Sequence, residues 1–261
     1  MDQVAAIMSN LQQALSNVSE ACGEPIRDFP GVTCARHRSC SADFNLAFVH
    51  EERALEHPVI RDVQGFFREI GASWCLVVPP TLTHLFDRVV KSIRISQRRA
   101  VPQMIMKSGD VSVPFPLRTL RIGRVDTISE LRIWARTMRA GFDMGRHDPF
   151  KEMLNARGLS TLRGTAYTGR VSGKAVATSV SYVTNGVGGI YGVSTIPRAR
   201  GRGYGEAMTW AAIRNGVSRS CEIISLQASP MGFPVYYRMG FRRVFDIEEW
   251  TIPAKAPDVA R

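Results

Sequence analysis

The chain has 261 residues, 44% of them hydrophobic and 22% charged, and a formal net charge of +11 at pH 7. This composition is typical of a soluble globular protein with one or two domains. No apolar run approaches the ~20 residues that cross a bilayer, so we expect no membrane partner.

The first 112 residues are predicted to be mixed α/β. Apolar residues recur with helical spacing between Val4 and Leu15. Apolar and β-branched runs predict strands over residues 31–35, 44–49, 74–78 and 101–106, and helical stripes predict helices over 59–70 and 82–95. This half contains no glycine-rich phosphate loop.

The proline-punctuated stretch Val111 to Pro116 predicts a boundary, because few elements could cross it. We therefore expect one domain over residues 1–112 and a second over 113–261.

The second half is predicted to begin with a strand over Leu117 to Val125 and a helix opened by a capping box, with Thr127 as N-cap and Glu130 at N3. Strands are expected over residues 165–171, 174–183 and 190–195. Asn185-Gly186 predicts the hairpin before the last of them, because this pair accepts the positive φ values of a tight turn.

A glycine-rich turn follows that strand and precedes an apparent helix. It reads Arg200-Gly201-Arg202-Gly203-Tyr204-Gly205. Glycine tolerates φ > 0 and has no Cβ to hold an anion away, and the helix adds unpaired N–H donors and the positive end of its dipole. We expect a phosphate or pyrophosphate here.

Two other glycine-rich motifs do not fit this turn. A P-loop is excluded because no Lys-Ser/Thr pair follows, and a dinucleotide fingerprint is excluded because Glu206 stands where its third glycine would be.

The turn fits R-x-x-G-x-G, as Arg200, Gly203 and Gly205, and thereby resembles the pyrophosphate loop of the Gcn5-related N-acetyltransferase (GNAT) superfamily. The resemblance implies an α/β (α+β) fold, with a mixed, mostly antiparallel sheet flanked by helices. The first half looks like a degenerate second copy of it. The implied co-substrate is acetyl-CoA, with no metal, held by Arg200, Gly201, Arg202, Gly203, Tyr204 and Gly205.

A second motif lies downstream, after a predicted strand over residues 222–227. Tyr236 to Phe241 reads Y-x-x-x-G-F and resembles the family's fourth helix and next strand. The resemblance implies that Tyr236 is the general acid, with Tyr237 as its neighbour. The alternative is a packed ring with a satisfied hydroxyl. Ser229 stands where many relatives hold the cofactor arm with asparagine.

In the family, the pantetheine arm pairs with the fourth strand. The resemblance therefore implies contacts to the backbone of Val193, Ser194 and Thr195. The general base is left open, because the strand over residues 189–195 has no carboxylate. Asp143, Asp148 and Glu222 are candidates, as is a water relayed by Ser or Thr, and the adjacent pair His147-Asp148 is a weaker one.

The whole positive charge lies in residues 118–261, which hold 22 Lys and Arg against 11 Asp and Glu. Such a domain attracts polyanions. No nucleic-acid motif accompanies it, so we expect CoA rather than nucleic acid. Five scattered cysteines without a CxxC pair, and an N-terminus unlike a secretory signal, predict a cytoplasmic protein.

The sequence thus predicts a GNAT-type acyltransferase that moves an acyl group other than an amino-acyl group from acetyl-CoA to a primary amine, directly in a ternary complex. A non-catalytic acyl-CoA-binding or protein-interaction module of the same fold is the alternative, and a nucleic-acid-binding protein a weaker one. The acceptor, a small molecule or a protein amine, stays open. We expect a monomer or homodimer.

Overall fold

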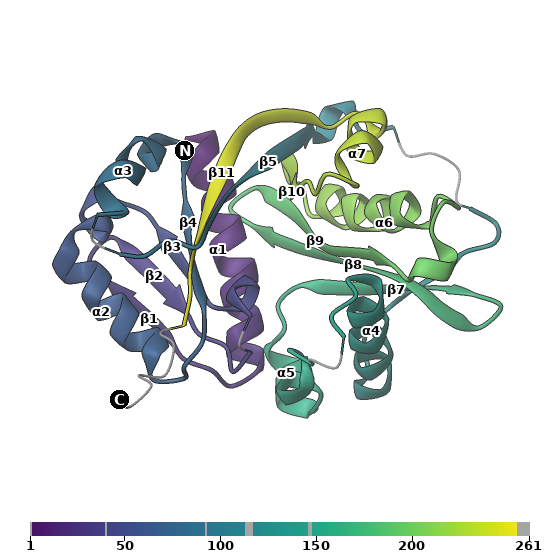
Figure 1. Cartoon of the computed structure of the whole chain (residues 1–261). Coiled ribbons are helices and arrows are strands. Elements are labelled where there is room, and N and C mark those ends of the chain that lie inside the picture. The colour runs from purple at the N-terminus through teal and green to yellow at the C-terminus, as the bar shows by residue number, and fades with distance from the viewer. Residues whose placement is uncertain (1, 40, 92, 113–116, 146–147, 255–261) are drawn as a thin grey trace.

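A computed structural model describes residues 2–39, 41–91, 93–112, 117–145 and 148–254 (Figure 1). Eleven strands within these ranges form one mixed sheet, in the order β1-β2-β3-β4-β11-β5-β10-β9-β8-β7-β6. Helices cover both of its faces.

The described residues of the first part of the chain form five strands and three α-helices. The strands are β1 (Ile26–Phe29), β2 (Val32–Ala35), β3 (Leu46–Val49), β4 (Trp74–Val78) and β5 (Gln97–Lys107), and the helices are α1 (Gln3–Ala21), α2 (His57–Arg68) and α3 (Phe86–Val89). Its core gathers mainly between α2 and the strands, and includes the stacked rings of Phe67 and Trp74.

In the second part, the residues that the structure describes form six strands and four α-helices. The strands are β6 (Arg121–Arg124), β7 (Thr165–Val171), β8 (Lys174–Thr184), β9 (Val187–Thr195), β10 (Ile223–Gln227) and β11 (Arg242–Ile252). The helices are α4 (Ile128–Gly141), α5 (Ala156–Thr161), α6 (Tyr204–Ser218) and α7 (Phe233–Met239).

Each part of the chain contributes one strand that pairs with strands of the other part. The C-terminal strand β11, yellow in Figure 1, lies between β4 and β5, with Trp250 opposite Leu76 on one side and Arg98 on the other. In turn β5 pairs antiparallel with β10, with Ser225 opposite Ile105. The N-terminal and C-terminal segments therefore complete each other's hydrogen bonding, and the predicted boundary at 112/113 divides the sequence without dividing the sheet.

Two strand–helix–strand units give the sheet its parallel pairs. Helix α2 connects β3 to β4, and α6 connects β9 to β10. The other pairs are antiparallel. The fold class expected from the sequence, a mixed and mostly antiparallel sheet flanked by helices, is confirmed.

Helix α6 and helices α1 and α4 pack on opposite faces of the strand pair β8–β9 (Figure 1). Successive residues of β9 show this division. Ile190 packs with Trp210 and Ile213 of α6, whereas Tyr191 packs with Leu11 of α1. The two sides of β9 therefore face different environments.

Local signals in the second half are accurate. The Thr127 hydroxyl accepts from the Glu130 backbone N–H at 3.2 Å, as in a capping box. The Glu130 carboxylate accepts from the N–H of Asp126 at 3.0 Å, one residue before the N-cap, whose N–H is the usual donor. Asn185 and Gly186 have φ values of 49° and 75°, as the hairpin requires.

Two elements are shorter than expected. The helix predicted over residues 82–95 is a 3-10 turn over Pro80–Leu85 followed by the single turn of α3. The strand predicted from Leu117 begins only at Arg121, because the Leu120 N–H closes a turn onto the Leu117 carbonyl at 3.1 Å. None of the helices in the described ranges is long and apolar enough to cross a bilayer.

Asn10 of α1 ties the N-terminal helix to β8 and β9. Its amide donates to the carbonyls of Tyr182 and Val187, both at 3.0 Å, and its oxygen accepts from the Tyr191 hydroxyl at 2.6 Å. Asn10 is fully buried. Since each unpaired buried polar group is costly, this side chain anchors α1 on the sheet.

We expect Asn10→Ala to lower the free energy of unfolding by about 2–4 kcal/mol, because it leaves two carbonyls and a hydroxyl without partners. Urea denaturation measures this, with the exposed Gln3→Ala on the same helix as control. A loss below ~1 kcal/mol would show that the Asn10 contacts do not hold the helix.

Candidate functional site

The glycine-rich turn between β9 and α6 has a backbone that only glycine adopts without strain. Gly201 and Gly203 both have φ +75°, and α6 begins at Tyr204 with Gly203 as its N-cap. Gly203 brings no side chain to satisfy the first N–H groups of the helix. The turn is exposed between Arg200 and Gly203.

Six consecutive backbone N–H groups of this turn, Gly201 to Glu206, find no acceptor within the described part of the chain. Alternating left-handed glycines and the helix start concentrate such donors in one concavity, and the helix dipole adds positive potential. This arrangement suits an anion with several oxygens, such as a diphosphate.

Arg200 holds the turn in place. Its Nε donates to the Thr195 carbonyl at 3.1 Å, and a terminal nitrogen donates to the Gly141 carbonyl at 2.9 Å. The guanidinium therefore links the turn to the ends of β9 and α4. The exposed side chains of Arg198 and Arg202 form no ion pair with a described residue.

Strand β9 has an open edge beside the turn. Its parallel pairing with β10 ends where Ile190 meets Leu226, but β9 continues to Thr195. Beyond that point β10 pairs only with β5. The predicted contact residues Val193, Ser194 and Thr195 all lie in the segment that has separated from β10.

A bulge in β9 marks the point where the strands separate. Gly192 has φ +57°, and the register with β8 shifts between Thr178 and Val180. The Thr178 hydroxyl lies 2.8 Å from the Ser194 hydroxyl and donates to the Gly192 carbonyl at 2.8 Å. The Ser194 side chain is thus held by β8.

Tyr236 is connected to the same turn. It is only 9% exposed, and the side chain of Thr209 in α6 lies near its hydroxyl. Thr209 in turn donates to the Gly205 carbonyl at 2.9 Å. Burial raises the pKa of Tyr236 to about 12, so the phenol keeps its proton at neutral pH. Tyr237 differs: it is 55% exposed and stacks on Phe233.

Ser229 begins the turn that leads into α7. Its hydroxyl accepts from the Gly232 N–H at 3.1 Å, and its carbonyl accepts from the Phe233 N–H at 2.9 Å. These bonds give Ser229 a local structural role. A contact with a cofactor stays a prediction.

The candidate bases do not gather at the open edge. Asp148 pairs with Arg139 at 2.8 Å and accepts from the Phe150 N–H at 3.1 Å. Glu222 is exposed and precedes β10, at the end opposite Leu226, and Asp143 is exposed in the turn after α4. His147 lies outside the described residues. No group of three or more described metal-ligating side chains could hold a metal ion.

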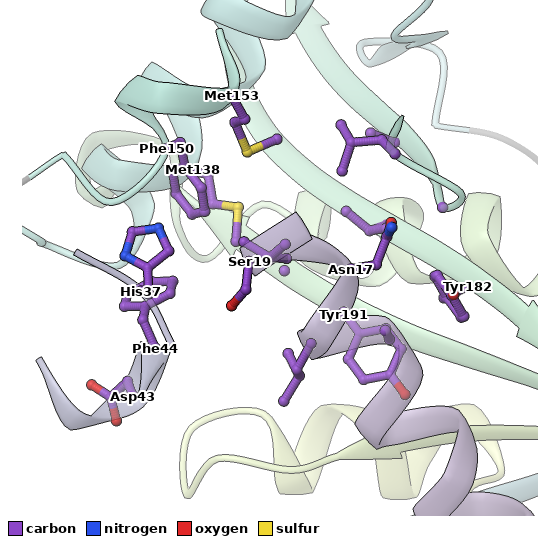
Figure 2. Close-up of a pocket in the computed structure, with 18 of the residues that line it drawn as sticks. Asn17, Ser19, His37, Asp43, Phe44, Met138, Phe150, Met153, Tyr182 and Tyr191 are labelled. Atoms are coloured by element: carbon purple, nitrogen blue, oxygen red, sulfur yellow. The ribbon is translucent and has the colours of Figure 1, made fainter. Parts of the chain in front are cut away.

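A cavity of about 180 Å³ adjoins the bulge on the α1 and α4 face (Figure 2). Residues from both parts of the chain line it: Ala14, Leu15, Asn17, Val18, Ser19, His37, Asp43, Phe44, Leu46, Trp134, Met138, Phe150, Met153, Leu162, Gly164, Ala166, Val180, Tyr182, Tyr191 and Gly192. No sequence motif marks α1, His37, Phe44 or Leu46 as lining residues, because only the tertiary fold brings them together with α4.

Known proteins resemble this chain in sequence and in fold. Residues 129–241 match the model of the Acetyltransferase (GNAT) family. A GCN5-related N-acetyltransferase from Kribbella flavida has a TM-score of 0.70 and 19% identity, covering 97% of this chain and 96% of that one. No curated protein matches the chain significantly.

Two further solved structures share the fold. A GCN5-related N-acetyltransferase from Sphaerobacter thermophilus has a TM-score of 0.62 at 12% identity, covering 85% of this chain and 76% of that one. A tandem GNAT protein from the clavulanic acid biosynthesis pathway has a TM-score of 0.57 at 12% identity, covering 87% and 79%. Residues 129–241 thus match the GNAT family, which the sequence motifs predicted, and 87% of the chain shares its fold with a tandem GNAT protein.

We expect Arg200→Ala to lower the free energy of unfolding by about 1–2 kcal/mol without any ligand, because two carbonyl contacts are lost. Arg202→Ala, which removes an exposed side chain, should change it by less than ~0.5 kcal/mol. Urea denaturation of both variants tests this. Equal stability of the two would mean that Arg200 does not hold the turn.

Proposed function

We propose that this protein is an N-acetyltransferase that transfers the acetyl group of acetyl-CoA to a primary amine, in a ternary complex of protein and both substrates. The observation that carries the proposal is the run of six unpaired backbone N–H groups at Gly201 to Glu206. The match to the GNAT family model, over residues 129–241, includes these donors and supports the proposal.

The residues of the turn fit the diphosphate of CoA. The amides of residues 201–206 would bind its oxygens, and the exposed guanidinium of Arg202 would add positive charge. The open edge of β9 at Val193 to Thr195 would receive the pantetheine amides as an added strand. The thioester supplies the acetyl group.

Tyr236 is the proposed general acid. Its proton is available for a leaving thiolate because burial keeps the phenol neutral. Thr209, which lies near the phenol, donates to the Gly205 carbonyl in the first turn of α6. A group that donates one proton per turnover must be both protonated and positioned. Burial keeps Tyr236 protonated, and its place beside the sulfur is part of the proposal.

Direct attack by the amine is favoured over an acyl-cysteine intermediate. The described thiol beside the cavity, Cys22, lies 3.3 Å from Nε2 of His37. Burial and the nearby Glu24 raise the pKa of Cys22 to about 12, so it is a thiol rather than a nucleophilic thiolate. The four described cysteines are free, which supports a reducing, cytoplasmic location.

A non-catalytic acyl-CoA-binding or protein-interaction module is the second candidate. The absence of a carboxylate from β9 favours it, since no base is evident there. The two candidates share the cofactor site and differ in turnover. Release of free thiol from acetyl-CoA over a panel of amines separates them.

Gly203→Glu should abolish CoA binding, with at least a 100-fold rise in Kd. It places a carboxylate among the amides at a φ of +75°. Gly186→Glu is the matched control, because Gly186 also has φ +75°, has open space around it and lies at the other end of β9. Calorimetry with CoA compares them. Equal affinity of the two variants would remove the turn from the cofactor site.

Tyr236→Phe should lower kcat by about 100-fold or more while CoA affinity stays near that of the wild type. The ring is kept, and Thr209 still donates to Gly205, so little stability is lost. Tyr237→Phe, on the exposed neighbour, is the control. Steady-state kinetics measure both, and unchanged turnover in Tyr236→Phe would contradict its role.

A further inference from the structure

The cavity beside Gly192 lies on the face of β9 opposite α6 and the glycine-rich turn. A cofactor held by the turn would reach the open edge from the α6 side. A second substrate that attacks directly needs the opposite approach, which the α1 and α4 face provides. The cavity lies on that face, between side chains of α1 and α4 (Figure 2).

The walls of the cavity are mostly hydrocarbon and aromatic. They include Leu15, Phe44, Trp134, Phe150 and Val180. A volume of about 180 Å³ slightly exceeds the engineered apolar cavities of ~150 Å³ that bind benzene. The space therefore suits a ring or a branched chain of about six carbons.

The polar residues that line the cavity are largely engaged with protein partners. The amide of Asn17 bonds Glu20 and the Thr161 carbonyl, both at 3.0 Å, and its oxygen accepts from Arg163. The Tyr191 hydroxyl donates to Asn10.

The ionisable side chains do not put a free charge in the cavity. His37 accepts from the Ser39 N–H through Nδ1, and its Nε2 faces the thiol of Cys22. The Asp43 side chain is 71% exposed and contacts the hydroxyl of Ser41. A charged group inside the cavity would lose its hydration without gaining a partner.

Not every polar group among the lining residues has a hydrogen-bond partner. Ser19 is 2% exposed, and its hydroxyl has no hydrogen-bond partner in the described part of the chain. The indole Nε1 of Trp134, another lining residue, is also unpartnered. Buried polar groups are normally satisfied, so an unpaired hydroxyl in an apolar cavity points to an occupant with one polar atom.

We propose that this cavity binds the side group of the acceptor: a primary amine that carries an uncharged, mainly hydrocarbon group about the size of a benzene ring, with one polar atom paired to Ser19. This inference rests on the proposed function. It gives the N-terminal part of the chain a role, since α1 and the lining residues His37, Asp43, Phe44 and Leu46 form one wall and so set acceptor specificity.

Acetyl transfer from acetyl-CoA to four amines tests the chemical class. Phenethylamine and tyramine should exceed ethanolamine and putrescine by at least tenfold in kcat/KM. Tyramine should exceed phenethylamine about fivefold in the wild type, and Ser19→Ala should remove that difference. An equal or greater rate with the small or charged amines would overturn the proposal.

The variant Ala14→Leu tests whether the side group of the acceptor occupies this cavity. This substitution extends a lining residue of α1 into the cavity, so the KM for phenethylamine should rise at least tenfold while CoA affinity is unchanged. Ala5→Leu, exposed on the same helix, is the control and should behave as the wild type. An Ala14→Leu variant with wild-type KM would contradict the assignment.

Two outcomes separate this inference from the proposed function. If Ala14→Leu reduces transfer from hexanoyl-CoA and leaves amine preference intact, the cavity holds the acyl chain and the inference is wrong. If the wild type transfers acetyl to no amine, the proposed function fails. In that case, calorimetry with phenethylamine tests the cavity by itself. Binding to the wild type that is tenfold weaker in Ala14→Leu supports the assignment. Absence of binding to the wild type overturns it.

Discussion

The structure depends on a backbone that leaves six neighbouring N–H groups without acceptors. Two glycines at φ +75° turn the chain so that residues 201–206 keep their donors free, and Arg200 fixes this turn to β9 and α4. The same turn starts α6, whose Thr209 lies near the hydroxyl of Tyr236. The proposed anion binding and the proposed proton donation would thus be coupled through one helix start, because a shift of that start would move the amides and the phenol together.

The exchange of β5 and β11 explains why the N-terminal part belongs to the site. Strand β11 completes the hydrogen bonding of β4, and β5 completes that of β10, so each part of the sheet needs a strand from the other. Asn10 adds a buried contact between α1 and the strands β8 and β9. With α1 held there, its inner face becomes a wall of the cavity beside Gly192.

Features that depend on near neighbours in sequence could be predicted. The R-x-x-G-x-G spacing, the Asn185-Gly186 turn and the capping box at Thr127 each act within a few residues, and the structure contains all three local conformations. The short helix over residues 86–89 shows the limit, because an apolar stripe does not distinguish a 3-10 turn from an α-helix. The placement of β11, the carbonyl contacts of Arg200 and the lining by Ser19 and His37 join distant segments, and no local pattern encodes them. The assignments of Tyr236, Ser229 and the turn residues to acetyl-CoA stay predictions.

The claim that the free amides of residues 201–206 hold a diphosphate is tested most directly by NMR of the ¹⁵N-labelled protein. The account expects CoA to shift the amide signals of Gly201 to Glu206 strongly, and expects pantetheine, which lacks the diphosphate, to leave them in place. CoA that binds without moving these signals, or pantetheine that moves them as much, would contradict the account.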